Sequence, residues 1–382
     1  MKATERFIIF LIIEVGMLCI AGISACFGEQ ISVGILLPLN GKMAIIGDIE
    51  KKAFEMAAEE LQNSDSFSQP RIVLYFRDTM GQPEVARRAA LSLITEDGVS
   101  LITGGCSSNA TFAAMQVAEE HSLPFLITTA SADKLTEMDM KYVYRLCSPA
   151  SEYTKPLLAL LSKFRGSKRG CILRENSRYG RHETKPIVRV CRKARVLVTD
   201  IITYPAQAVS DEATYFQKLQ LIRPDILFVL ARGSEPVRIL ALVQVLDKIP
   251  RLIFCKGDAF LKADTYIEAQ SALGNIYTTA PWHPAVTYMG AQEFYQRFRE
   301  RYGIEPDYHA AQAYASLQVI AHAVSQALSP DPEGIREALD QSELMTVLGL
   351  VRFQSYGGKE RQNRPLKVLL RWTGENLLPV SY

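Results

Sequence analysis

Apolar and polar residues follow a repeating strand-and-helix pattern along the chain. Short apolar runs at 31–39 ("ISVGILLPL") and 71–78 ("RIVLYFRD") are typical of buried strands, and the segment 49–63 between them has the apolar spacing of a helix. Regular alternation of this kind predicts a parallel sheet with helices on both faces. Because ligands bind at the carboxyl ends of the strands in such sheets, the loops there are the candidate functional segments.

The pattern restarts after about residue 150, which predicts a second α/β lobe. Strands are expected at 169–175 ("RGCILRE"), 225–232 ("DILFVLAR") and 251–256 ("RLIFCK"). Near the C-terminus, the segment 348–374 predicts a hairpin that turns at two adjacent glycines.

The first residues predict export. Lys2 and Arg6 precede an apolar run, and this run ends in the small residues of "ISAC" at Cys26. The ending resembles the lipobox of bacterial lipoproteins, which implies cleavage before Cys26 and lipid on its thiol and its new amino group. We therefore expect residues 1–25 to be a signal peptide and Cys26 to be lipidated. An ordinary signal peptide or an uncleaved anchor is the alternative.

Composition narrows the classes of function. The 382 residues include 43 Lys and Arg and 41 Asp and Glu, well mixed, so the net charge of +2 gives no reason to expect a nucleic-acid surface. Five cysteines follow Cys26, an odd number that leaves at least one thiol unpaired within the chain. Neither the cysteines nor the five histidines have the spacing of a metal site. We expect no metal and no cofactor.

The stretch "LITGGCSSNATFAA", which begins at Leu101, contains the first candidate site. A strand ends at two glycines, and Ser107 or Ser108 can cap the helix that follows. The N–H groups at a helix N-terminus attract anions. The stretch has neither the Gly-Lys-Ser/Thr of a nucleotide-binding loop nor the Gly-x-Ser-x-Gly of a serine hydrolase. A helix cap without a ligand is the alternative interpretation.

Beyond the signal segment, the chain resembles the type I periplasmic binding proteins, in the branch that includes the Leu/Ile/Val-binding receptors of ABC importers. The resemblance rests on the order of several segments, namely "ISVGILLPLNGKMAIIGD", "GGCSSNAT", "LPFLITTASADKLT", "VYRLCSP", "ENSRYG" and "FRERYGIEP". It implies two doubly wound parallel-sheet lobes, joined by a three-strand hinge, that close on a ligand. The N-terminal lobe would comprise 26–149 and 281–345, and the C-terminal lobe 150–280 and 346–382.

The resemblance also implies how the first lobe binds an amino acid. Ser107 and Ser108 of the glycine turn would hold the ligand's α-carboxylate, and Ser131 would add a second hydroxyl. Thr129 and Ala130 would supply backbone groups near the ligand's carboxylate and ammonium.

On the second lobe, the resemblance implies that Asp258 binds the ligand's ammonium and that Tyr179 closes over the ligand. A helix cap at Asp258 and a surface aromatic at Tyr179 are the alternatives. Arg232 follows an apolar strand at a position where amino-acid receptors commonly have a neutral or aromatic residue. Its guanidinium needs an anion, which is either Glu235 or another internal carboxylate, or a second polar or acidic group of the ligand.

The resemblance implies a solute-binding lipoprotein of an ABC importer that binds an amino acid or a related small molecule. It would be periplasmic or on the cell surface, and its partners would be the ligand, the permease subunits and a membrane through the lipid anchor. A stand-alone sensor of the same fold for amides or small carboxylates is the alternative. An enzyme with Cys106 or Ser107 as nucleophile is a third reading of the chain, but the sequence places no base beside either residue.

Overall fold

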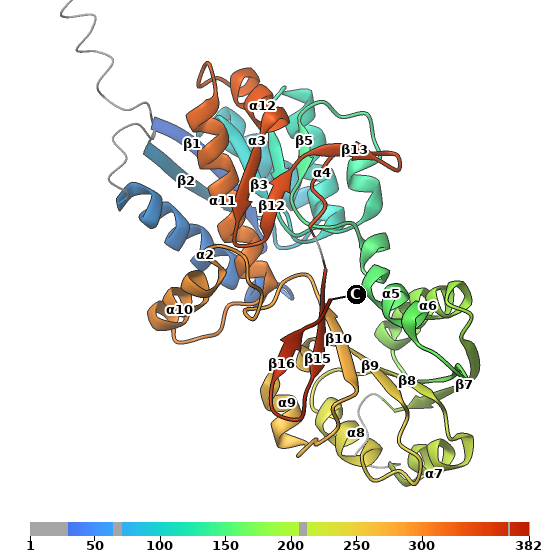
Figure 1. Ribbon diagram of the computed structural model, residues 1–382. Coiled ribbons are helices and arrows are strands. Elements are labelled where there is room, and N and C mark those ends of the chain that lie inside the picture. The colour runs from blue at the N-terminus through green and yellow to red at the C-terminus, as the bar shows by residue number, and fades with distance from the viewer. Residues whose placement is uncertain (1–29, 64–70, 206–211, 366, 382) are drawn as a thin grey trace, which may run out of the picture. The chain divides into compact units, whose positions relative to one another are not determined.

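The protein is described by a computed structural model that covers residues 30–63, 71–205, 212–365 and 367–381 (Figure 1). The expected signal peptide and Cys26 lie outside the described residues. The chain divides into two compact units. Unit 1 comprises the described residues up to Ala130, with Asp139–Tyr144 and Ala313–Leu344, and unit 2 comprises Ser131–Met138, Arg145–Gln312 and the described residues from Met345.

The first sheet is seven-stranded, in the order β13-β14-β5-β4-β3-β1-β2. β1 pairs in parallel with β2 and β3, β3 pairs in parallel with β4, and β13 is antiparallel to β14. Its strands are β1 (Gln30–Leu37), β2 (Arg71–Asp78), β3 (Leu101–Gly104), β4 (Phe125–Ile127), β5 (Val143–Arg145), β13 (Gln354–Tyr356) and β14 (Lys359–Gln362).

Helices cover both faces of this sheet. Because the strand order reverses between β1 and β3, α2 lies on the opposite face from α3 and α4. The packing of α3 against α4 agrees with this arrangement. The reversal also makes the carboxyl ends of β1 and β3 the switch point of the sheet. The helices are α2 (Ala44–Asn63), α3 (Pro83–Thr95), α4 (Ser108–Glu120), α11 (Tyr308–Gln326), of which the part from Ala313 belongs to unit 1, and α12 (Pro332–Gln341).

The second sheet is also seven-stranded, in the order β16-β15-β10-β9-β8-β6-β7. Its strands from β6 to β10 are parallel, and β15 is antiparallel to both β10 and β16. The strand order reverses between β6 and β8, so the loops after these strands form its switch point. The strands are β6 (Arg169–Glu175), β7 (Leu197–Tyr204), β8 (Ile226–Leu230), β9 (Leu252–Lys256), β10 (Ile276–Ala280), β15 (Val368–Trp372) and β16 (Leu377–Pro379).

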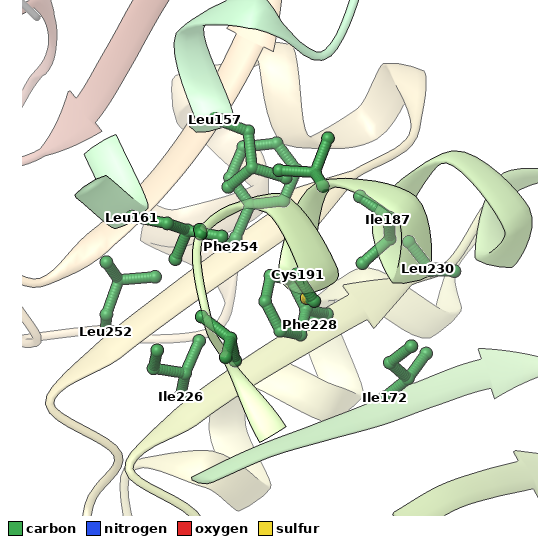
Figure 2. Close-up of a cluster of buried hydrophobic side chains, with 13 residues drawn as sticks. Leu157, Leu161, Ile172, Ile187, Cys191, Ile226, Phe228, Leu230, Leu252 and Phe254 are labelled. Carbon is green, nitrogen blue, oxygen red and sulfur yellow. The ribbon is translucent and has the colours of Figure 1, made fainter. Parts of the chain in front are cut away.

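One core cluster of unit 2 lies between this sheet and two helices. Leu157 and Leu161 of α5 and Ile187 of α6 pack with Phe228 of β8 and Phe254 of β9 in one buried cluster (Figure 2). Every residue of β8 is buried, as expected for a strand covered on both faces. The remaining helices and strands of the unit are α5 (Lys155–Lys163), α6 (Arg178–Lys193), α7 (Glu212–Ile222), α8 (Glu235–Val243), α9 (Ala263–Glu268), α10 (Ala291–Tyr302), β11 (Glu343–Thr346) and β12 (Gly349–Arg352), β11 beginning just before the boundary at Met345.

The cysteines of the described part of the chain form no disulfide. These cysteines are Cys106, Cys147, Cys171, Cys191 and Cys255. Burial raises the pKa of Cys171 and of Cys191 to about 12, so these two thiols stay protonated and pack as small apolar groups.

The prediction of two doubly wound α/β lobes is confirmed, and so is the hairpin near the C-terminus, which turns between Tyr356 and Lys359. The hairpin pairs with β5 of the first sheet although the described residues from Met345 belong to unit 2, so the lobe boundaries expected from the sequence stay a prediction. A sequence pattern shows that two neighbouring strands pair, but it does not show which sheet edge the pair extends.

In the part of the chain that the structure describes, no helix is both long enough and apolar enough to cross a membrane.

Candidate functional site

Two glycines form the sharp turn from β3 into α4 in unit 1. Gly104 and Gly105 have φ angles of +108° and +84°. A Cβ atom on Gly104 would lie 2.3 Å from the carbonyl oxygen of Leu36, so only glycine fits this close to the neighbouring strand. The turn brings Ser107 to the N-cap position of α4 with an extended backbone. The sequence interpretation of a strand, a glycine turn and a helix N-terminus is therefore confirmed.

The side chain of Ser107 does not cap this helix. Its hydroxyl accepts no capping hydrogen bond from the first turn. Ser107 is half-buried and lines a small hollow together with Cys106, Gly105 and Thr79. Ser108, the other serine of the turn, is the first residue of α4 and is also half-buried. The hydroxyl of Ser107 thus lies beside a helix N-terminus without serving that helix.

Thr129 and Ala130 lie beside the same turn. Their N–H groups donate to the carbonyl oxygen of Gly105 at 3.3 and 2.9 Å, and the Thr129 hydroxyl donates to the buried carboxylate of Glu50 at 2.8 Å. These N–H groups are therefore engaged within unit 1, and the binding of a ligand's carboxylate and ammonium by backbone groups of Thr129 and Ala130 stays a prediction.

Unit 2 contains a pocket of about 210 Å³ beside the carboxyl ends of β9 and β10. Two of the predicted ligand-binding residues, Tyr179 and Asp258, line this pocket together. The other lining residues are Tyr153, Glu183, Lys256, Gly257, Leu261, Thr279, Ala280, Pro281, Tyr308 and Lys367.

Tyr179 is fixed between the pocket and Arg232. It lies in the first turn of α6, and its hydroxyl donates to the carbonyl oxygen of Lys256 at 3.1 Å. Burial raises the pKa of Tyr179 well above its ordinary value, so the hydroxyl remains a donor. The Arg232 guanidinium lies 4.4 Å from the centre of the tyrosine ring. Tyr179 is therefore held in place on two sides.

Arg232 is not among the lining residues of the pocket. Its half-exposed side chain forms an ion pair with Glu175 at the end of β6, with 3.3 Å between nitrogen and oxygen. The sequence left open whether the anion beside Arg232 is an internal carboxylate or a group of the ligand, and in the structure an internal carboxylate pairs with it. That carboxylate is Glu175 and not Glu235, which lies 3.7 Å from Arg238.

Asp258 lines the pocket, whereas Ser131 contacts only a residue of its wall. Asp258 follows Gly257 at the end of β9, begins the short 3-10 helix η4 (Asp258–Leu261) and is exposed. Ser131, assigned to unit 2, forms a side-chain hydrogen bond with Tyr153 in the pocket wall. Asp258 therefore faces the pocket directly, whereas Ser131 supports one of its walls.

The sequence reasoning missed two lysines of this pocket. Lys256 is the last residue of β9 and lies 3.1 Å from Glu183, and Lys367, which precedes β15, lies 3.9 Å above the ring of Tyr153. The pKa of Lys367 is lowered to about 7, mainly by burial and in smaller part by the charge of Lys256. Lys256 could have been found from its place at the carboxyl end of a strand. No local pattern distinguishes Lys367 from other lysines.

Lys367 should make the stability of the protein increase with pH above neutrality. In the unfolded chain a lysine keeps its ordinary pKa of 10.5, whereas burial lowers the pKa of folded Lys367 to about 7. Between these values the unfolded state binds more protons. The free energy of unfolding should therefore rise by up to about 1.4 kcal/mol per pH unit from this group.

Urea denaturation of the wild type and of Lys367→Met, in reducing buffer between pH 7 and pH 9, measures this effect. The variant should lack the part of the increase that comes from the lysine. Parallel pH profiles for the two proteins would contradict the prediction.

Comparisons with known proteins agree with this architecture. Residues 30–369 match a family model described as "Periplasmic binding protein". Leu/Ile/Val-binding protein homolog 7 of Brucella melitensis is 23% identical over 369 residues, which covers 92% of this chain and 91% of the relative.

Solved structures show the same fold. The branched-chain amino acid transporter substrate-binding protein LivJ of Streptococcus pneumoniae, in complex with isoleucine, has a TM-score of 0.68 at 21% identity and covers 91% of this chain and 98% of its own. A solute-binding protein of an ABC transporter from R. palustris, in complex with benzoate, has a TM-score of 0.68 at 18% identity, with coverages of 92% and 96%. At these identities the similarity establishes the fold and leaves the ligand open.

Proposed function

Because this chain belongs to the periplasmic binding protein family, we propose that it is the extracytoplasmic solute-binding protein of an ABC importer. The family predicted from the sequence is confirmed, and the chain is a binding protein and not an enzyme. Its protein partners would be the permease subunits of the importer.

The proposed ligand is an amino acid or a related small carboxylate. The observation that carries this proposal is the pocket of unit 2, because it contains both Tyr179 and Asp258. Asp258 would bind the ligand's ammonium, and the hydroxyl of Ser107 and the N-terminus of α4 would bind its carboxylate. Isoleucine and benzoate, the ligands of the two structural neighbours, both carry a carboxylate. Closure of the two lobes on the ligand is part of the proposal.

A thermal-shift screen against amino acids, amides, urea and small carboxylates tests this function. A ligand present at a hundred times its dissociation constant should stabilise the folded protein by about 2.7 kcal/mol, which is readily measured. Stabilisation by one class of small carboxylate would support the proposal. A protein that none of these compounds stabilises, although it is folded and free of bound ligand, would contradict it.

Asp258 should contribute to the binding of any ligand that carries an ammonium. We expect Asp258→Asn to weaken binding by about 2 kcal/mol, because the ammonium would lose its anionic partner. Asp264, an exposed residue in the first turn of α9, supplies the matched control, since Asp264→Asn removes a similar charge outside the pocket. Calorimetry on the three proteins measures the effect. Equal affinities for Asp258→Asn and the wild type would remove Asp258 from the site.

We also propose that Cys26 is the lipidated N-terminal residue of the mature protein. Two acyl chains and a third, amide-linked chain would hold the protein stably on a membrane. Cys26→Ser should therefore release the protein from the membrane fraction or stop its processing. Fractionation with a salt wash, together with the intact mass of the mature protein, measures this. An unlipidated wild-type protein that salt removes from membranes would contradict the proposal.

A further inference from the structure

One face of α6 in unit 2 carries basic side chains along its whole length. The opposite face, with Ile187 and Cys191, is buried in the core cluster (Figure 2). The exposed cationic residues recur every three or four positions, which places them on one side of the helix. We call this side the basic stripe, and it consists of Arg178, Arg181, Lys185, Arg189, Arg192 and Lys193.

No carboxylate of the described residues neutralises the basic stripe. Within that part of the chain none of its six side chains forms an ion pair, and Arg181 donates to the amide oxygen of Asn176 at 3.3 Å. Glu183, the one acidic residue of α6, is half-buried and pairs with Lys256 at 3.1 Å. The net charge of +2 for the whole chain therefore conceals a strong local excess of positive charge.

The stability of the helix does not explain the basic stripe. Arg192 and Lys193 lie in the last turn, where cations interact favourably with the helix dipole, but Arg178 is the first residue, where they do not. No acidic residue lies in the first turn to offset this charge. Like charges four positions apart, such as Arg181 and Lys185, also repel one another. The arrangement therefore lowers the stability of α6, which favours a role in binding.

Another surface helix of unit 2 shows the ordinary pattern. Opposite charges are interspersed along α10, as is typical of a helix face that contacts only water. Its exposed charged residues are Glu293, Arg297, Arg299, Glu300 and Arg301. The basic stripe differs from this pattern, because no acidic residue of α6 is exposed.

The exposed face of α6 fits an extended anionic surface better than another protein. Protein interfaces centre on buried aromatic or apolar anchors. Apart from the basic stripe, His182 is the one exposed residue of α6, so the helix offers no such anchor. The helix has 16 residues and is about 24 Å long, and clusters of about four to eight Lys and Arg are typical of surfaces that bind anionic lipid headgroups. Because the apolar face is buried in the core, the contact would be electrostatic, without insertion into the bilayer.

We propose that the basic stripe binds the anionic phospholipid headgroups of the membrane at which the protein works. The inference goes beyond solute binding and beyond the lipid anchor, and it takes only the location at a membrane from the proposed function. A lipid anchor at Cys26 would raise the local concentration of the basic stripe at that membrane, so a weak electrostatic contact would still be well populated.

Sedimentation with vesicles tests the inference on the whole chain that follows the expected signal peptide. The chain carries Cys26→Ser, so that no lipid anchor contributes to binding. Vesicles of phosphatidylcholine with about one third phosphatidylglycerol are compared with vesicles of phosphatidylcholine alone. At about 50 mM NaCl the protein should bind the anionic vesicles and not the neutral ones, and about 500 mM NaCl should release it.

Variants in this background test the basic stripe itself. The triple variant Arg181→Gln/Lys185→Gln/Arg189→Gln should lower the partition coefficient about 100-fold, because each basic residue close to an anionic surface contributes roughly a factor of five. Arg181→Lys/Arg189→Lys keeps the charge and should bind as the unsubstituted stripe does, whereas bidentate pairing with protein carboxylates would be weakened. Circular dichroism checks the fold, and Arg192→Gln/Lys193→Gln is the second variant if the triple variant does not fold.

The matched control removes three positive charges from α10. Arg297→Gln/Arg299→Gln/Arg301→Gln should change vesicle binding by no more than about threefold, because opposite charges already surround these residues. Equal losses in the two triple variants would assign the binding to net charge and overturn the inference.

The remaining outcomes separate this inference from other partners and from the proposed function. A folded protein that does not bind anionic vesicles at low salt would overturn it. Binding to poly-L-glutamate without binding to the vesicles would identify an acidic protein as the partner and overturn it as well. The substituted positions of α6 do not line the pocket, so every variant should bind the solute as the unsubstituted protein does. A failed solute screen would therefore count against the proposed function, whereas vesicle binding alone decides the role of the basic stripe.

Discussion

Replacing Arg145 with methionine should lower the free energy of unfolding by about 3–5 kcal/mol. Arg145 is fully buried at the end of β5. Its guanidinium donates to the carbonyl oxygen of Ala132 at 2.6 Å, to the hydroxyl of Thr136 at 2.7 Å and to the side-chain oxygen of Gln362. Methionine fills much of the same space but donates to none of these three acceptors. Each buried acceptor left unsatisfied costs about 1–3 kcal/mol.

Arg145 holds together segments that are far apart in sequence. Gln362 pairs with Arg145 between β14 and β5. Its side chain accepts a hydrogen bond from the guanidinium and donates one to the carbonyl oxygen of Cys147 at 2.8 Å, so two side-chain hydrogen bonds support this strand pairing. A lysine at this position would keep the charge, but a single ammonium cannot reproduce the three directions of a guanidinium. We therefore expect Arg145→Lys to be nearly as destabilising as Arg145→Met.

Arg364 supplies the matched control for Arg145. Its side chain is 56% exposed and lies over the ring of Tyr356, so Arg364→Met should cost less than about 1 kcal/mol. Urea denaturation of the three proteins, followed by circular dichroism, measures the difference. If Arg145→Met and Arg364→Met were equally stable, the hydrogen bonds of Arg145 would contribute little to the free energy of unfolding, which contradicts the prediction.

The sequence was sufficient to predict the parts of the fold that depend on local patterns. The apolar strand β8 is buried at every position, and its uninterrupted run of apolar residues predicts this burial. The turn at Gly104 was equally predictable, because two glycines after an apolar strand leave few other conformations. Asp258 and Tyr179 were predicted from the resemblance to a family, and the structure brings both to one pocket.

The partners of charged side chains could not be predicted from the sequence. Glu235, three residues beyond Arg232, was the obvious neighbour, but Arg232 pairs with Glu175 because β6 lies beside β8 in the sheet. Lys367 and Tyr153 meet although 214 residues separate them, as their numbers in the sequence show. Both contacts depend on the order of the strands in the sheet, and local sequence patterns do not reveal that order.

Gly257 connects this topology to the proposed binding site, because it separates the two charged residues Lys256 and Asp258 at the end of β9. Its backbone has φ +143° and ψ 151°, a conformation that essentially only glycine adopts. A Cβ atom there would lie 1.9 Å from the carbonyl oxygen of Ala231, which belongs to the backbone and cannot rotate away.

We therefore expect Gly257→Ala to lower the free energy of unfolding by about 3–5 kcal/mol, from backbone strain and steric overlap together. Gly233 is the matched control, because it also has a positive φ, +64°, but a Cβ on it would meet no atom within 4 Å. Gly233→Ala should cost only about 1–2 kcal/mol, the strain of the left-handed conformation.

The relief of the overlap in Gly257→Ala would move the chain on either side of the residue, so ligand affinity should fall in this variant and remain unchanged in Gly233→Ala. Urea denaturation and calorimetry on both variants measure the two effects. A Gly257→Ala protein that matches Gly233→Ala in stability and in affinity would show that the end of β9 can shift without cost, and the rigid placement of Lys256 and Asp258 would then be wrong.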